Sequence, residues 1–162
     1  MSFVHLRMAA GAQPEAARAV LAERSRNPAL ACATAEALTA ELAASDQSPL
    51  PRVLQALSRP MRIVRGKDID TSIAVDEGLF EGDAEGALYA ALQAARRRVT
   101  PDITLAEWLQ VAQELVSPID RFFDEVFVMA EDEALRRNRL ALLQDVVAVT
   151  AGVLDLAELP GF

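Results

Sequence analysis

The segment from residue 47 to residue 67 carries five basic side chains and no acidic one. A guanidinium group donates paired hydrogen bonds to phosphate and stacks on unpaired bases, so such a segment is typical of an RNA-binding surface. A solvated helical face would carry the same charges, and the residue types alone leave both interpretations open. The five candidates for RNA contact are Arg52, Arg59, Arg62, Arg65 and Lys67.

Two further groups of arginines follow. Residues 96–98 are three consecutive arginines, which we interpret as complementing the dipole at the C-terminal end of a helix. In the last group, Arg136 and Arg137 are further candidates for RNA contact. At about 100° per residue, Arg137 points toward solvent on the predicted helix.

Arg139 differs from its neighbours, because it falls inside the apolar stripe of the same predicted helix. A guanidinium buried in a core needs a carboxylate or carbonyl partner, since an unpaired buried charge is very costly. We therefore predict that Arg139 is structural and binds Asp120 or Asp124 on the preceding helix.

The sequence contains little that indicates a catalytic or metal-binding site. The single histidine, His5, has no serine or cysteine that periodicity would place beside it, and Cys32 fits a small buried thiol. Asp68 and Asp70 form a weak carboxylate pair that suits a turn better than a cation site. The acidic run 131–133 precedes a predicted helix and complements its N-terminus. We expect no catalytic residue and no metal ligand, and a small hydrolase is the weakest alternative.

The overall charge limits how RNA could be bound. Sixteen basic and twenty-four acidic residues give a net charge of −8 and an isoelectric point near 4.7, so any RNA contact must be local. One cysteine cannot form an internal disulfide, which fits a reducing compartment. The N-terminus lacks a signal-peptide pattern and no long apolar run is present, so we expect a cytoplasmic protein without membrane contact.

The composition, which is 52% hydrophobic and rich in alanine and leucine, favours helices. Apolar spacing and capping signals predict about six helices packed antiparallel in an all-α bundle. Pro60 and Pro118 are expected to end or kink their helices, and Thr104 with Glu107 forms a capping-box pattern. The predicted helices cover residues 14–25, 28–45, 50–65, 83–98, 104–130 and 132 onward, with Asp83 as a cap and a loop at 66–82.

Residues 119–143, IDRFFDEVFVMAEDEALRRNRLALL, resemble the C-terminal DALR-type anticodon-binding region of the bacterial glycyl-tRNA synthetase beta subunit. That family reads there as a Phe-Phe-Asp helix end, an acidic turn and a helix that opens Asp-x-Ala-Leu-Arg-x-Asn-Arg-Leu. Residues 27–118 look like earlier blocks of the same domain. We expect an N-terminal helical appendage at 1–26 and the domain at 27–162. The motif residues with a structural role would be Asp120, Asp124, Asp132, Leu135, Asn138 and Arg139.

The resemblance implies a function as well as a fold. A domain of this class contacts the anticodon side of tRNA(Gly) and has no aminoacylation chemistry or cofactor of its own. ATP and Mg²⁺ are expected only at the catalytic site of the parent enzyme, on an alpha subunit or the alpha part of a fused chain. The chain departs from the family after Leu143, where Gly152 stands in a segment expected to be helical.

A structural or subunit-interaction domain that barely touches RNA is the main alternative, and the acidic isoelectric point favours it. Core-like sequence begins soon after Met1, which fits either a part of a longer protein or a short free-standing relative. Binding that weakens with salt would support the RNA-binding interpretation.

Overall fold

The computed structural model describes residues 13–65, 73–160 and 162. Within these ranges the chain is all-α, as predicted, and has no β-strand. Single 3₁₀ turns join or follow the helices: η1 (Ser45–Gln47), η2 (Glu77–Leu79) and η3 (Leu156–Glu158). None of the helices in the described ranges is long and apolar enough to cross a membrane. The described residues contain six α-helices: α2 (Pro14–Arg24), α3 (Pro28–Ala44), α4 (Leu50–Arg65), α5 (Asp83–Arg98), α6 (Leu105–Glu125) and α7 (Glu133–Ala148).

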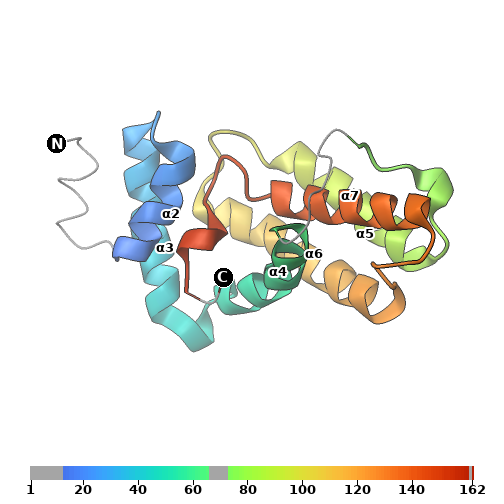
Figure 1. The fold of residues 1–162 in the computed structure, drawn as a ribbon. Coiled ribbons are helices and arrows are strands. Elements are labelled where there is room, and N and C mark those ends of the chain that lie inside the picture. Colours follow the sequence, from blue (N-terminus) through green and yellow to red (C-terminus); the bar gives the residue numbers. More distant parts are fainter. Residues whose placement is uncertain (1–12, 66–72, 161) are drawn as a thin grey trace.

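The helices form a bundle with a helical pair at one end. Figure 1 shows α2 and α3 side by side, with the C-terminal η3 turn packed against α2. Helix α6 is the centre of the rest, because α4 and α5 both pack on it and α7 packs on α4. The backbone N–H of Asp155 donates to the carbonyl of Ala19 (2.8 Å), which ties the C-terminal segment to α2. The proposed boundary near residue 26 stays a prediction.

Local capping explains where three helices begin. The Thr104–Glu107 capping box is confirmed: the Thr104 hydroxyl accepts from the Glu107 N–H (3.2 Å), and the Glu107 carboxylate accepts from the Thr104 N–H (3.1 Å). Asp132 caps α7 by accepting from the Leu135 N–H (3.0 Å). The predicted cap at Asp83 was wrong by one residue, because Gly82 is the cap and the Glu85 carboxylate accepts from its N–H (3.3 Å).

The two internal prolines do not end their helices. Helix α4 continues past Pro60 and α6 continues past Pro118, so neither proline ends its helix, and a kink at each stays a prediction. A proline removes one backbone hydrogen bond, yet burial of the apolar face on both sides of it can outweigh that loss. Pro60 is itself buried, and Ile119 and Phe122 are buried after Pro118.

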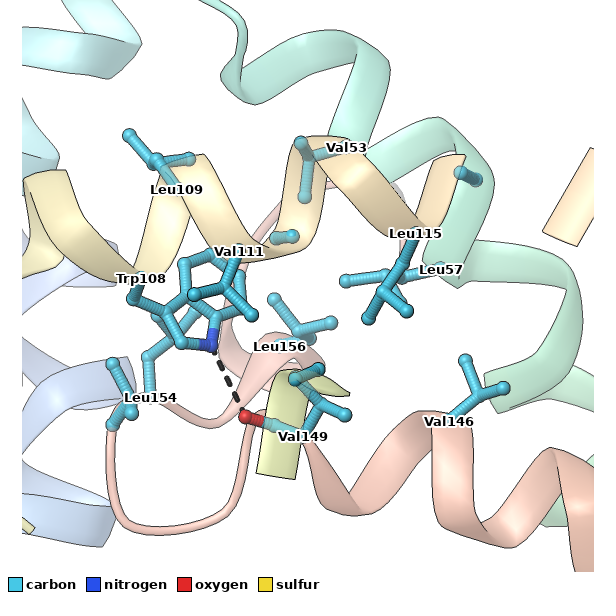
Figure 2. Packing of buried hydrophobic residues seen from close by; sticks show 14 of the residues in the cluster. Val53, Leu57, Trp108, Leu109, Val111, Leu115, Val146, Val149, Leu154 and Leu156 are labelled. Carbon is cyan, nitrogen blue, oxygen red and sulfur yellow. Dashed lines mark hydrogen bonds between the residues drawn. The ribbon is translucent and has the colours of Figure 1, made fainter. Parts of the chain in front are cut away.

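The core lies where α4, α6, α7 and the C-terminal segment meet. Trp108 on α6 is completely buried, and its indole N–H donates to the backbone carbonyl of Val149 (3.1 Å). Figure 2 shows this bond near Leu154 and Leu156 of the C-terminal segment. Val149 is the C-cap of α7, where backbone carbonyls lack a partner inside the helix, so the indole satisfies a helix end as well as filling the core.

Gly152 lies in a turn rather than in a helix, which corrects the expectation from sequence. Helix α7 ends at Ala148, and Gly152 has a φ of +77°, a conformation that costs other L-residues energy. Its N–H donates to the Glu23 carboxylate (2.8 Å), and its carbonyl accepts from Arg24 (2.9 Å). The glycine therefore lets the chain turn back toward α2.

Replacing Gly152 with alanine is expected to lower the free energy of unfolding by about 1 kcal/mol. An added Cβ would meet nothing within 4 Å, so the loss comes from backbone conformation alone. Gly86→Ala is the matched control, because Gly86 lies inside α5 and alanine there should stabilise by roughly 0.5–1 kcal/mol. Urea denaturation of both variants checks this, and the same sign for both would contradict it.

Candidate nucleic-acid interface

Helix α4 presents its arginines on the face opposite the core. Leu50, Val53 and Leu57 are fully or nearly fully buried, because they follow the three- and four-residue spacing of an amphipathic helix. The arginines at positions 52, 59, 62 and 65 are exposed. Lys67, the fifth candidate, lies outside the described residues. The basic segment is thus helical as far as residue 65, with its charges toward solvent.

Arg52 is held by a carboxylate of the neighbouring helix. Its guanidinium forms an ion pair with Asp120 on α6 and donates to the Gln55 side chain on its own helix (3.5 Å). Asp120 was one of the two expected partners of Arg139, and it pairs with Arg52 instead. The ion pair joins α4 to α6 at the surface and neutralises part of the basic face.

Arg59 and Phe123 meet across the same two helices. The Arg59 guanidinium carbon lies 4.2 Å from the centre of the Phe123 ring, which is a cation–π contact. The Phe123 ring packs edge-on against Phe122 (5.5 Å between ring centres, 81° between planes), and Phe122 is completely buried. The buried neighbour and the guanidinium together hold Phe123 in place.

A groove of about 330 Å³ opens between α4 and the C-terminal half of α6. Both basic and acidic side chains line it, and it contains the Arg52–Asp120 pair and the Arg59–Phe123 stack. Asp124, the other expected partner of Arg139, lines the groove and makes no ion pair or hydrogen bond with any residue that the structure describes. The lining residues are Arg52, Gln55, Ala56, Arg59, Ile119, Asp120, Phe123 and Asp124.

Arg139 is buried, as predicted, but its predicted partners were wrong. Its Nε donates to Glu85 (2.9 Å), its NH2 group to Glu81 (2.7 Å) and its NH1 group to the carbonyl of Phe127 (2.9 Å). Burial acts to lower the pKa of Arg139, but the hydrogen bonds to Glu85 and Glu81 outweigh this and leave the pKa above its ordinary value. The helical period indicated that Arg139 would be buried, but its carboxylate partners come from α5 (Glu85) and from the segment just before α5 (Glu81) rather than from α6.

Asn138, predicted as a structural motif residue, and Arg136 and Arg137, predicted as candidates for RNA contact, all find partners within the fold. Asn138 binds the backbone of Asp76 twice, accepting from its N–H (2.7 Å) and donating to its carbonyl (2.9 Å). Arg136 donates to the carbonyl of Ala130 (3.2 Å) in the turn before the helix. Arg137 is exposed and pairs with Glu133 one turn earlier (2.6 Å). Asp76 was missed from sequence because nothing in its local pattern points to α7.

The arginines at 96–98 occupy the last turn of α5, as interpreted from sequence. Arg96 pairs with Asp145 of α7 (2.5 Å), and Arg98 pairs with Glu114 of α6 (2.7 Å). Two of these charges are therefore already partnered within the fold.

Comparison with known families decides what kind of domain this is. Residues 53–160 match the DALR anticodon binding domain. The chain belongs to this family. The matched residues begin inside α4 and include α5, α6, α7 and η3 of this DALR domain, so the helices that carry the groove are part of the family fold.

Relatives of the DALR domain extend the similarity to its N-terminal helices. The chloroplastic/mitochondrial glycine–tRNA ligase 2 of Arabidopsis thaliana is 42% identical over 152 residues, which are 94% of this chain and 14% of that protein. The glycine–tRNA ligase beta subunit of Nitrosomonas europaea is 33% identical over 162 residues, 97% of this chain and 23% of that protein. The beta subunit of Chromohalobacter salexigens is 41% identical over 107 residues, 64% of this chain and 16% of that protein. The expected family is confirmed, and the chain spans less than a quarter of each relative.

Proposed function

We propose that this DALR domain recognises the anticodon loop of tRNA(Gly) as part of a glycine–tRNA ligase. The match to an anticodon-binding family over residues 53–160 is the observation that carries the proposal. Glycylation, with its ATP and Mg²⁺, would take place on the remaining polypeptide, an alpha subunit or the alpha part of a fused chain. The domain itself would position the tRNA.

The charge distribution supports a local contact. The net charge of −8 repels RNA at long range, whereas the exposed arginines of α4 form a basic stripe within one helix. Such a stripe contacts backbone phosphates and places the loop bases beside the groove between α4 and α6. Proteins read RNA sequence mainly in unpaired loops, and the anticodon lies in such a loop.

Fluorescence anisotropy of a labelled tRNA(Gly) anticodon hairpin is the direct test. We expect the hairpin to bind the chain more tightly than a scrambled-loop hairpin of equal length and charge, and less tightly as salt rises. Arg65→Ala should weaken binding to both hairpins and reduce the slope of log affinity against log salt by about 1. Arg18→Ala on α2, an exposed arginine paired with Glu158 (3.3 Å), is the control and should leave the slope unchanged. No binding to either hairpin at low salt would contradict the proposal.

Docking on the rest of a ligase is the second candidate function. Phe127 and Met129, in the turn between α6 and α7, are 72% and 40% exposed, and an exposed aromatic beside an exposed thioether is typical of a protein contact. This function predicts that Phe127→Ser weakens association with the remaining synthetase but leaves hairpin binding unchanged. Weaker hairpin binding with normal association would favour RNA contact at this turn instead.

A further inference from the structure

The groove between α4 and α6 has the wrong charge for a phosphate group. Asp120 and Asp124 line it, and Arg52 is already paired with Asp120. A phosphate accepts hydrogen bonds but donates none, and it would meet two carboxylates at close range. The groove therefore fits a chemical group that both accepts and donates hydrogen bonds.

One basic and one acidic side chain in the groove make no hydrogen bond within the described residues. Arg59 stacks on Phe123 and donates no hydrogen bond, and Asp124 accepts none, within the part of the chain that the structure describes. A guanidinium and a carboxylate in one groove usually pair, as Arg52 and Asp120 do here. Arg59 is held by the aromatic ring instead, and Asp124 keeps its full acceptor capacity.

The Arg59–Phe123 pair offers a planar surface. Unpaired RNA bases stack on aromatic rings and on guanidinium planes, and both are present at this one position. Buried Phe122 packs edge-on against the Phe123 ring, so the surface is formed without a ligand. A volume of about 330 Å³ lies at the lower end of the range of about 300–1,000 Å³ found for small-ligand pockets.

We propose that this groove receives one unpaired base, which stacks on Arg59 and Phe123 while Asp124 accepts a hydrogen bond from the exocyclic amino group of that base. Carboxylates read cytosine through its N4 amino group in this way, and uracil presents a carbonyl oxygen at the same place. The inference rests on the proposed function and adds a reading mechanism to it: the arginines of α4 other than Arg59 bind the backbone, Arg59 stacks on the base, and Asp124 selects that base.

Hairpins with one stem and loops of equal length, containing either only cytosine or only uracil, test the proposal. They have the same charge and ring size; they differ at position 4, which is an amino group in cytosine and a carbonyl in uracil, and at N3, which accepts a hydrogen bond in cytosine and donates one in uracil. We expect the 162-residue chain to bind the cytosine loop about tenfold more tightly, in line with one good base contact. Asp124→Asn should abolish the preference, because a carboxamide can donate to the uracil oxygen as well as accept.

Two further variants distinguish base selection by Asp124 from base stacking on Phe123 and from the general effect of removing a negative charge. Phe123→Leu should weaken binding of both loops by about tenfold and keep their ratio, since stacking tolerates any base. Asp102→Asn removes an exposed carboxylate before α6, at the opposite end of that helix from Asp124, and should keep the cytosine preference. Circular dichroism of each variant establishes that it is folded.

The outcomes separate this inference from the proposed function. Equal binding of the two loops by the unmodified chain, or a cytosine preference that survives Asp124→Asn, overturns base reading by Asp124. Salt-dependent binding of both loops would then leave the anticodon function standing. Binding of no loop at low salt overturns the proposed function, and the inference with it.

Discussion

Trp108→Ala is expected to lower the free energy of unfolding by about 3–5 kcal/mol. The side chain is completely buried where α6 faces the C-terminal end of α7 and the segment that follows it (Figure 2). Its removal leaves a large cavity and also strips the Val149 carbonyl of its donor, and an unpaired buried carbonyl adds to the cost. The loss should appear as a lower urea midpoint, followed by circular dichroism because Trp108 is the only tryptophan.

A second variant at Trp108 separates the two parts of that loss, and a variant at an exposed aromatic residue is the control. Trp108→Phe keeps most of the volume but cannot donate to Val149, so we expect a loss of about 1–3 kcal/mol from the missing hydrogen bond and the smaller ring. Phe127→Ala removes an aromatic side chain that is 72% exposed and should change stability by less than about 0.5 kcal/mol. A loss below 1 kcal/mol for Trp108→Ala would show that α6 does not organise the core as described.

The helices were predictable because each signal for them is local. Thr104 and Glu107 are three residues apart, and the cap they form depends only on each other. Apolar spacing within α4 determined which arginines face outward, and the structure places them there. Of the two effects predicted for Pro60, a helix end does not occur, because the local rule ignores the burial of the surrounding turns, which only the tertiary packing supplies.

Only part of the candidate site could be predicted from the sequence. Its arginines lie on one helix, but the groove needs α6 beside α4, and no pattern in either segment specifies that neighbour. Phe123 has the residue type of a core position, yet it is half-buried and carries Arg59 on its ring. Asp120 and Asp124 were predicted as alternative partners of buried Arg139 and instead line the groove. Helical period predicts which side chains are buried, but it does not predict which helix covers them.

Arg139→Ala is expected to destabilise the fold by about 3 kcal/mol, the cost of breaking a buried ion pair. Arg139 and Glu85 have side chains that are 8% and 2% exposed, so the variant leaves a buried carboxylate without its cation. It also removes the donor to the Phe127 carbonyl, which holds the turn between α6 and α7. Exposed Arg137, two residues earlier, is the matched control, and Arg137→Ala should be nearly silent because surface ion pairs contribute little.

A pair of double-mutant cycles tests whether Glu85 is the partner of Arg139. In urea denaturation, the loss of unfolding free energy in the Arg139→Ala/Glu85→Ala double variant should be smaller than the sum of the two single losses by about 0.5–3 kcal/mol. The reason is that each single variant already breaks the same contact. Glu85 also accepts from the Glu81 and Gly82 N–H groups, so its own loss includes the capping of α5 and will exceed the shared part. Arg139→Ala with Asp124→Ala should instead be additive within about 0.5 kcal/mol. Coupling to Asp124 and none to Glu85 would restore the pairing expected from sequence and remove Asp124 from the groove as a free acceptor.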